Sequence, residues 1–200
     1  MKQAYRIAVL GASGLVGGKM LEILAKSNVP IATCIPLASA RSAGKTVLFK
    51  GVAQTILDVA QFDFSDVDFA LFSAGGDAAK QYAPIAVKAG CTVIDNSSAF
   101  RYDDDVALVV PEVNGTVLSN KAAQIIANPN CSTIQMVVAL KPIYDAVGIT
   151  RINVATYQAG AGSGLAGITD LQTGVDAHVN QQPPAAGQTY ATPIAFNVIP

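Results

Sequence analysis

The chain alternates short apolar runs, which are typical of buried strands, with longer segments of helical periodicity. The predicted strands are Tyr5–Leu10, Ile31–Leu37, Phe69–Ser73, Thr92–Asp95, Ala107–Val110, Gln124–Ala127 and Ile152–Gln158. Apolar residues at helical spacing predict helices over Leu15–Lys26 and Ser132–Ala146, the second ended by Gly148. A further helix is expected after Asp77 as its N-cap, divided by Pro84 into two short pieces.

This order of elements predicts an α/β protein with a Rossmann-like, doubly wound and mostly parallel sheet. The alternation changes near residue 130, so we expect one domain over residues 1–130 and the beginning of a second, α+β domain over residues 131–200. Residues 180–188 are expected to form a polar loop. Because residues 193–200 are apolar and lack a polar tail, we expect the sequence to be the front part of a longer protein.

Composition narrows the function classes. Hydrophobic residues make up 51% of the chain, which excludes a disordered protein. The 13 basic and 14 acidic residues nearly cancel, so no basic surface for nucleic acid or membrane is expected. No apolar run approaches a membrane span. The three cysteines lack metal-ligand spacing, which predicts no metal site and reduced thiols in the cytoplasm.

A glycine-rich segment, Gly11-Ala-Ser-Gly14-Leu-Val-Gly17, joins the first predicted strand to the first helix. Glycines at this spacing allow a tight turn, the approach of backbone to a pyrophosphate, and close helix–strand packing. The helix N-terminus adds free N–H groups. We therefore predict dinucleotide binding; the alternative is an ordinary glycine-rich turn.

The end of the second predicted strand indicates which dinucleotide is bound. An NAD site usually has an acidic residue here for the ribose 2′-hydroxyl, but this segment carries Arg41 between Ser39 and Ser42. A guanidinium with neutral donors suits a 2′-phosphate, so NADP is favoured over NAD. The alternative is a polar turn with a solvated arginine.

Cys131 precedes the second long helix within Asn-Pro-Asn-Cys-Ser-Thr. A helix N-terminus stabilises a thiolate, and Asn130, Ser132 and Thr133 offer capping groups and donors for an oxyanion. We expect Cys34 and Cys91, which lie in or beside apolar strands, to be buried and inert. A dinucleotide fold with a nucleophilic thiol suggests hydride transfer to or from an acyl group.

The motifs GASGLVG, LASARSAGK, FSAGG, DNSSAFR, VPEVN, NPNCST and TYQ resemble, in this order, those of aspartate-β-semialdehyde dehydrogenases. The resemblance implies NADPH-dependent reductive dephosphorylation of β-aspartyl phosphate to aspartate β-semialdehyde, a step toward lysine, methionine and threonine. It also implies a homodimer with an N-terminal NADP-binding domain and a C-terminal catalytic and dimerisation domain.

The resemblance also implies roles for particular residues. Cys131 would be the acyl-thioester nucleophile, with Gln158 positioning the substrate. The substrate and its phosphate would contact Arg101, Asn96, Ser98 and Asn130. The NADP contacts would come from Gly11, Ser13, Gly14, Leu15, Val16, Gly17, Ser39, Arg41, Ser42, Ser73, Ala74, Gly75 and Gly162, and residues 111–114 would lie near the nicotinamide.

Two departures from the family pattern are visible. Ala161 replaces a hydroxyl expected near the cofactor, for which Ser163 could substitute. The family's catalytic histidine and its arginine and acidic residue for the amino-acid end would lie beyond residue 200, and His178 is interpreted as a solvated surface residue. Two alternatives remain open: a related phosphate-linked reductase of the N-acetyl-γ-glutamyl-phosphate or glyceraldehyde-3-phosphate type, and a catalytically silent binding or assembly protein.

Overall fold

The computed structural model describes residues 3–118, 124–183 and 187–199. The chain divides into two compact units, residues 1–152 and 153–200, and each is described by itself. This division follows from contacts within the chain and does not test the domain boundary expected at residue 130. That boundary stays a prediction.

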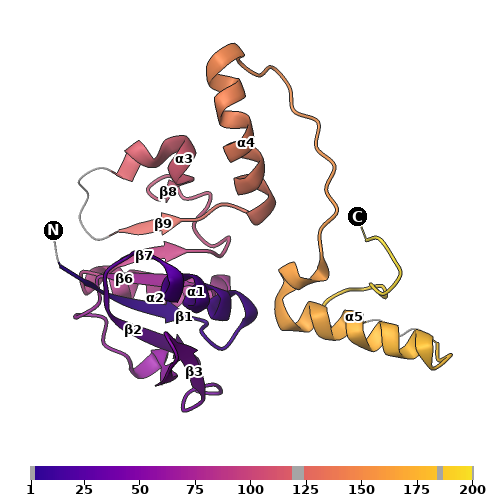
Figure 1. The fold of residues 1–200 in the computed structure, drawn as a ribbon, viewed down its shortest axis with the longest axis horizontal. Coiled ribbons are helices and arrows are strands. Elements are labelled where there is room, and N and C mark those ends of the chain that lie inside the picture. Colours follow the sequence, from indigo (N-terminus) through magenta and orange to yellow (C-terminus); the bar gives the residue numbers. More distant parts are fainter. Residues whose placement is uncertain (1–2, 119–123, 184–186, 200) are drawn as a thin grey trace. The chain divides into compact units, whose positions relative to one another are not determined.

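A seven-stranded sheet in the order β5-β2-β1-β6-β7-β9-β8 organises the first unit, and every neighbouring pair in it is parallel (Figure 1). Its strands are β1 (Tyr5–Leu10), β2 (Ile31–Ala38), β5 (Leu57–Asp58), β6 (Phe69–Phe72), β7 (Thr92–Asp95), β8 (Ala107–Leu108) and β9 (Ile125–Ala127). The predicted doubly wound parallel sheet is confirmed. The order reverses between β1 and β6, and in such sheets ligands bind outside the carboxyl ends of the strands at this point.

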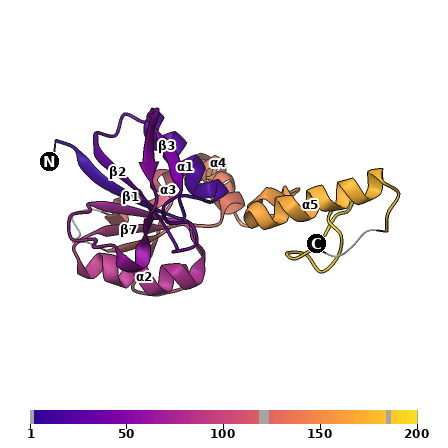
Figure 2. The same ribbon diagram turned by 90° about the horizontal axis from the view of Figure 1, so that it is seen from below.

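Alternate side chains of β1 enter two different cores. Ala8 and Leu10 belong to the larger cluster, whereas Val9 belongs to the smaller one. The larger cluster contains the small-residue face of helix α2 (Gly76–Lys88), and the smaller contains Leu21 of helix α1 (Leu15–Lys26). The two helices therefore cover opposite faces of the sheet, as Figure 2 shows.

Most predicted elements are confirmed. The bounds of β1, α1 and β7 match the predicted residues, and β2, β6 and β9 differ by one residue. Helix α4 (Cys131–Val147) begins one residue before the prediction and ends at Gly148, which has φ +72°. Strand β8 is shorter than predicted because Val110 already serves as the N-cap of helix α3 (Pro111–Asn114).

The prediction that Pro84 divides the helix after Asp77 into two short pieces is wrong, because α2 is continuous through Pro84. Pro84 lies on the exposed side of the helix, where the carbonyl of Lys80 that loses its helical donor can bond to water instead. The N-cap is Gly75 rather than Asp77, and Asp77 lies in the first turn, where its charge complements the helix dipole.

Several short elements of the first unit were not predicted. Strands β3 (Thr46–Phe49) and β4 (Val52–Thr55) form an antiparallel hairpin. Its turn residues Lys50 and Gly51 both have positive φ, at 50° and 78°, as a type I′ turn requires. Two 3₁₀ turns, η1 (Val59–Gln61) and η2 (Gly115–Leu118), complete the unit.

The second unit contains the 3₁₀ turn η3 (Gly160–Ser163) and helix α5 (Gly164–Val179), which was not predicted. The predicted strand over Ile152–Gln158 is wrong: these residues are in no regular element, and a strand requires a paired neighbour, which no described residue provides. The polar loop expected over residues 180–188 is confirmed where it is described; residues 184–186 lie outside the described residues.

Two contacts hold the chain after α5, one against that helix and one against η3. The Asp170 carboxylate accepts hydrogen bonds from the amides of Thr189, at 2.7 Å, and Gln188, at 3.0 Å, which lower its pKa. Tyr190 lies with its hydroxyl 2.9 Å from Ser163 Oγ and donates toward the Gly160 carbonyl at 3.3 Å. Among the described residues, no helix is long and apolar enough to cross a membrane.

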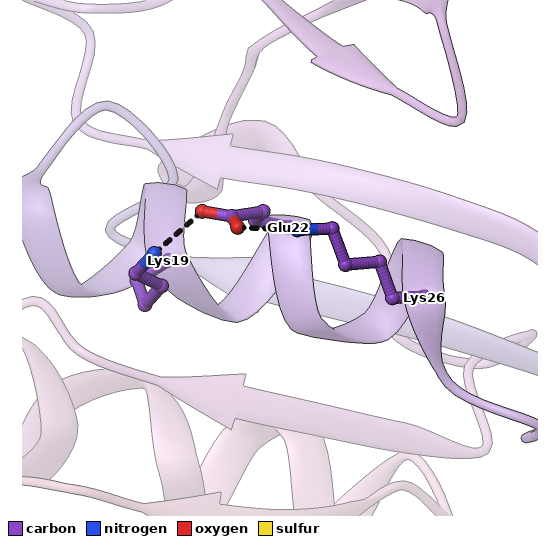
Figure 3. A network of polar contacts seen from close by, with 3 residues as sticks. All are labelled: Lys19, Glu22 and Lys26. Atoms are coloured by element: carbon purple, nitrogen blue, oxygen red, sulfur yellow. Dashed lines mark hydrogen bonds and ion pairs between the residues drawn. The ribbon is translucent and has the colours of Figure 1, made fainter.

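The exposed side of α1 carries a network of three charges (Figure 3). Glu22 accepts hydrogen bonds from Lys19, at 2.6 Å, and Lys26, at 2.8 Å. These bonds and the two positive charges hold the pKa of Glu22 at about 2. The network is solvated, and it belongs to the helix surface rather than to a binding site.

Two adjacent glycines of α1 give a matched test of the packing. A Cβ at Gly17 would lie 2.1 Å from the Gly11 carbonyl oxygen, whereas a Cβ at Gly18 would meet nothing within 4 Å. Gly17→Ala should therefore lower the free energy of unfolding by about 1–3 kcal/mol. Gly18→Ala should raise it by up to about 1 kcal/mol through helix propensity. Urea unfolding of both variants checks this, and equal effects would contradict the close packing.

Candidate active site

The predicted site residues of the first unit follow the carboxyl ends of neighbouring parallel strands. In the spatial order of the strands, Ser39, Arg41 and Ser42 follow β2, and Gly11, Ser13 and Gly14 follow β1. Ser73, Ala74 and Gly75 follow β6, and Asn96, Ser98 and Arg101 follow β7. Asn130 and Cys131 follow β9. Leu15, Val16 and Gly17 form the first turn of α1. The parallel sheet thus brings residues that are far apart in the sequence to one edge.

The turn after β1 requires its glycines for steric reasons. Gly11 has φ +88°, and a Cβ there would lie 2.8 Å from the Ser73 backbone. Gly17 lies against the Gly11 carbonyl, and Gly14 is the N-cap of α1 with no side-chain cap. The N–H groups of the first turn of α1 are thus not occupied by a capping side chain. This geometry fits a pyrophosphate at the helix N-terminus.

The loop after β2 has the form expected for a 2′-phosphate contact. Ser42 is buried and its amide donates to the Ser39 carbonyl at 2.8 Å, which makes a tight turn. Arg41 and Ser39 are exposed at the outside of this turn. The turn therefore fixes the backbone that carries the arginine and leaves the guanidinium accessible.

A second backbone turn lies beside Gly11. The Ser73 amide and hydroxyl donate to the Leu10 carbonyl at 2.9 and 3.1 Å, which joins the ends of β6 and β1. Gly75 follows with φ +87° and caps α2 without a side chain. Two helix N-termini with free amides therefore lie on either side of the β1–β6 pair.

The turn after β7 is built around a buried carboxylate. Asp95 is fully buried, and its oxygens accept hydrogen bonds from the Ser97 amide at 3.1 Å and the Ser97 hydroxyl at 2.6 Å. The Ser97 hydroxyl oxygen in turn accepts the Ala99 amide at 3.1 Å. These bonds fix the backbone that carries Asn96 and Ser98.

Arg101 spans the ends of β7 and β9. Its Nε donates to the Asn128 carbonyl at 3.0 Å, and one Nη donates to the Asn96 carbonyl at 3.1 Å. Neither partner carries a negative charge, and the structure records no ion pair of Arg101 with the described residues. Three guanidinium N–H groups remain for an anion.

Cys131 is the first residue of α4 and is exposed. The Asn130 side chain caps the helix by accepting the amides of Ser132, at 3.1 Å, and Thr133, at 3.3 Å. The predicted cap is therefore confirmed, but both amides are occupied and do not serve an oxyanion. The Asn130 Nδ2 group donates to no atom of the described residues, so it is a side-chain donor still available next to Cys131 in the sequence.

The other two cysteines are buried, as predicted. Burial raises the pKa of the Cys34 thiol to about 11, partly opposed by Lys50, and burial with the nearby Asp68 carboxylate raises that of Cys91 to about 12. Neither thiol is therefore a nucleophile near neutral pH.

Gln158 and Gly162 belong to the second unit. Gln158 is exposed and lies beside a cavity of about 560 Å³ that Leu171 and Phe196 also line. Gly162 lies in η3, next to Ser163, whose hydroxyl contacts Tyr190. His178 is exposed, as predicted, and its ring packs on that of Phe196 with centroids 4.6 Å apart.

Sequence reasoning assigned no role to two residues of the site. Asp95 appears in the sequence only as the last residue of a strand, and the first asparagine of Asn-Pro-Asn-Cys, Asn128, is indistinguishable by type from Asn130. A carboxylate at a strand end with a serine two residues later signals an Asx turn. No local signal indicates that Asn128 faces Arg101.

Fold and site together define a dinucleotide-binding α/β protein with a thiol at a helix N-terminus of its binding edge. A family model described as semialdehyde dehydrogenase, NAD binding domain, matches residues 6–121, and one described as semialdehyde dehydrogenase, dimerisation domain, matches residues 140–200. The chain belongs to the semialdehyde dehydrogenase family.

Individual relatives agree with this. The chain is 56% identical to an aspartate-semialdehyde dehydrogenase of Shewanella violacea over its whole length, which is 59% of that protein. It is similar to the Vibrio cholerae aspartate semialdehyde dehydrogenase II complexed with ASA, with a TM-score of 0.94, 51% identity, and coverage of 100% of this chain and 59% of that one. The Candida albicans enzyme with NADP matches with a TM-score of 0.62, 27% identity, and coverage of 73% and 48%. The chain thus spans about 59% of the length of the first of these relatives.

Alkylation tests the difference between the three thiols. At pH 9 a thiol with a pKa of 11 is about 1% thiolate, so iodoacetamide should modify Cys131 well before Cys34 and Cys91 across pH 7–9. Mass spectrometry of the alkylated peptides measures the three rates, and Cys131→Ser should remove the fast one. Equal rates at all three positions would contradict the burial described here.

Proposed function

We propose that this protein is an aspartate-semialdehyde dehydrogenase that reduces β-aspartyl phosphate to aspartate β-semialdehyde with NADPH. The observation that carries the proposal is the exposed Cys131 on the first turn of α4, at the same sheet edge as the Arg101 guanidinium. The names of relatives that are 56% and 51% identical support the substrate.

In the proposed reaction the Cys131 sulfur attacks the acyl carbonyl carbon, a C–S bond forms, and the phosphate leaves with the electrons of its C–O bond. Arg101 binds the phosphate through its free N–H groups, and its two carbonyl partners hold the guanidinium in place beforehand. Asn130 Nδ2 donates to the developing oxyanion. When bound, NADPH would supply the hydride that reduces the thioester carbonyl, and the sulfur of Cys131 would then leave as the thiolate.

The glycine turn and the Arg41 loop would hold the cofactor. A Cβ at Gly11 or Gly17 would collide with backbone, so the turn after β1 fits a ligand that approaches the main chain closely. Arg41 with Ser39 and Ser42 favours the 2′-phosphate of NADP over NAD. The relative solved with NADP supports the same preference.

The remaining contacts of the site are also proposed. Gln158 would position the substrate, Asn96 and Ser98 would contact its phosphate, and Ser73 to Gly75 with Gly162 would contact the cofactor. The match of residues 140–200 to a dimerisation domain supports a homodimer. A cytoplasmic location stays a prediction from the reduced cysteines.

Cys131→Ser tests the chemistry. We expect loss of the NADPH oxidation that β-aspartyl phosphate elicits, by at least about 1000-fold, with an unchanged dissociation constant for NADPH. Cys34→Ala, which removes a buried thiol, is the matched control and should keep turnover. Absorbance of NADPH reports the first quantity and fluorescence titration the second. Turnover that survives in the serine variant would refute the nucleophile, and a silent binding protein would show no turnover in any form.

Arg41→Ala tests the cofactor assignment. Losing a charge-assisted contact to the 2′-phosphate should weaken NADPH binding by about 10- to 100-fold and leave NADH binding unchanged. Lys88→Ala removes the same charge at the last residue of α2, away from the carboxyl edge of the sheet, and should change neither. Equal weakening of both dinucleotides by Arg41→Ala would contradict the assignment.

A further inference from the structure

Asn128 joins three parts of the site by hydrogen bonds. Its Nδ2 donates to the side-chain oxygen of Asn96 at 2.6 Å, and its amide donates to the Asp95 carbonyl at 2.8 Å. Its own carbonyl accepts Arg101 Nε at 3.0 Å. One half-buried residue thus connects the end of β9 to the end of β7 and to the guanidinium.

The contacts close a ring. Arg101 also donates to the Asn96 carbonyl, so Asn96 and Asn128 each accept one guanidinium N–H with their main chain while their side chains bond to each other. The side-chain pair, together with the bond from the Asn128 amide to the Asp95 carbonyl, therefore holds the two carbonyls at a fixed separation. A long arginine side chain would otherwise sample many rotamers.

The two asparagines of the segment before Cys131 have different surroundings. Asn130 bonds to the first turn of α4, whereas Asn128 bonds to the turn after β7. Pro129 between them is buried. The segment thus connects the thiol to the phosphate-binding arginine through three consecutive residues.

We propose that Asn128 is a positioning residue for the phosphate: it acts through Arg101, by fixing the guanidinium between the ends of β7 and β9. This role rests on the proposed function for its substrate, but its physical content is a coupling between Asn128 and Arg101 in the binding of phosphate. Asn128 itself donates its side chain to Asn96 and is not among the residues proposed to contact the substrate.

A double-mutant cycle measures that coupling. Asn128→Ala should weaken the binding of inorganic phosphate by about tenfold. Calorimetry measures this as the dissociation constant, and kinetics measure it as the KM for phosphate in the oxidation of aspartate semialdehyde by NADP. The kcat of that reaction and the affinity for NADP should change little. In an Arg101→Ala background the same substitution should have no further effect. Asn180→Ala removes one side-chain donor to a main-chain carbonyl on α5 and should leave phosphate affinity unchanged.

The outcomes separate this role from the proposed function. The positioning role is overturned if Asn128→Ala lowers phosphate affinity by the full tenfold also in the Arg101→Ala background. It is equally overturned if Asn128→Ala does not lower phosphate affinity in the parent protein. If the effects of Asn128→Ala and Arg101→Ala on phosphate binding are coupled but the protein has no turnover, the positioning role is supported and the proposed function is refuted. If the parent protein does not bind phosphate, both are overturned. If Asn128→Ala also loses dinucleotide affinity, Asn128→Leu, which keeps the side-chain volume and removes the amide, takes its place in the cycle.

Discussion

The parallel pairing of β1 with both β2 and β6 is the constraint on which the site depends. Because all strands of the seven-stranded sheet run in one direction, the loops that follow them meet at a single edge, and residues from position 11 to position 131 share it. The sheet can only approach α1 closely where side chains are missing, so Gly11 and Gly17 are a requirement of packing as well as of ligand binding. Both the packing of the fold and the binding of a ligand therefore require glycine at these two positions.

The site also shows how a protein orients charged groups with neutral partners. Arg101 is held by two carbonyl oxygens and keeps its positive charge available, whereas a carboxylate partner would compete with a phosphate. The one buried carboxylate of the turn after β7, Asp95, is satisfied by the amide and hydroxyl of Ser97. Asp95 thereby fixes the turn, while a different residue, Arg101, is available to bind the substrate.

Much of this could be predicted from local sequence pattern. Strand β1, helix α1 and the glycine turn have strong periodicity and spacing, and Cys131 follows a capping asparagine. The continuous α2 could not be predicted, since the cost of Pro84 depends on which side of the helix is solvated. Helix α5 has Leu165, Ile168 and Leu171 at helical spacing, but its glycines and polar residues weaken this signal. The contact of Asn128 with Asn96, 32 positions away, is set by the order of the strands, which no local pattern contains.

The most direct test of the central claim is to trap the covalent intermediate. The protein is mixed with β-aspartyl phosphate in the absence of NADPH, quenched in acid, and digested for mass spectrometry. We predict that the peptide containing Cys131 gains the mass of one aspartyl group, that one equivalent of phosphate is released, and that hydroxylamine removes the added mass. An unmodified Cys131 with phosphate released, or acylation at another residue, would contradict the account.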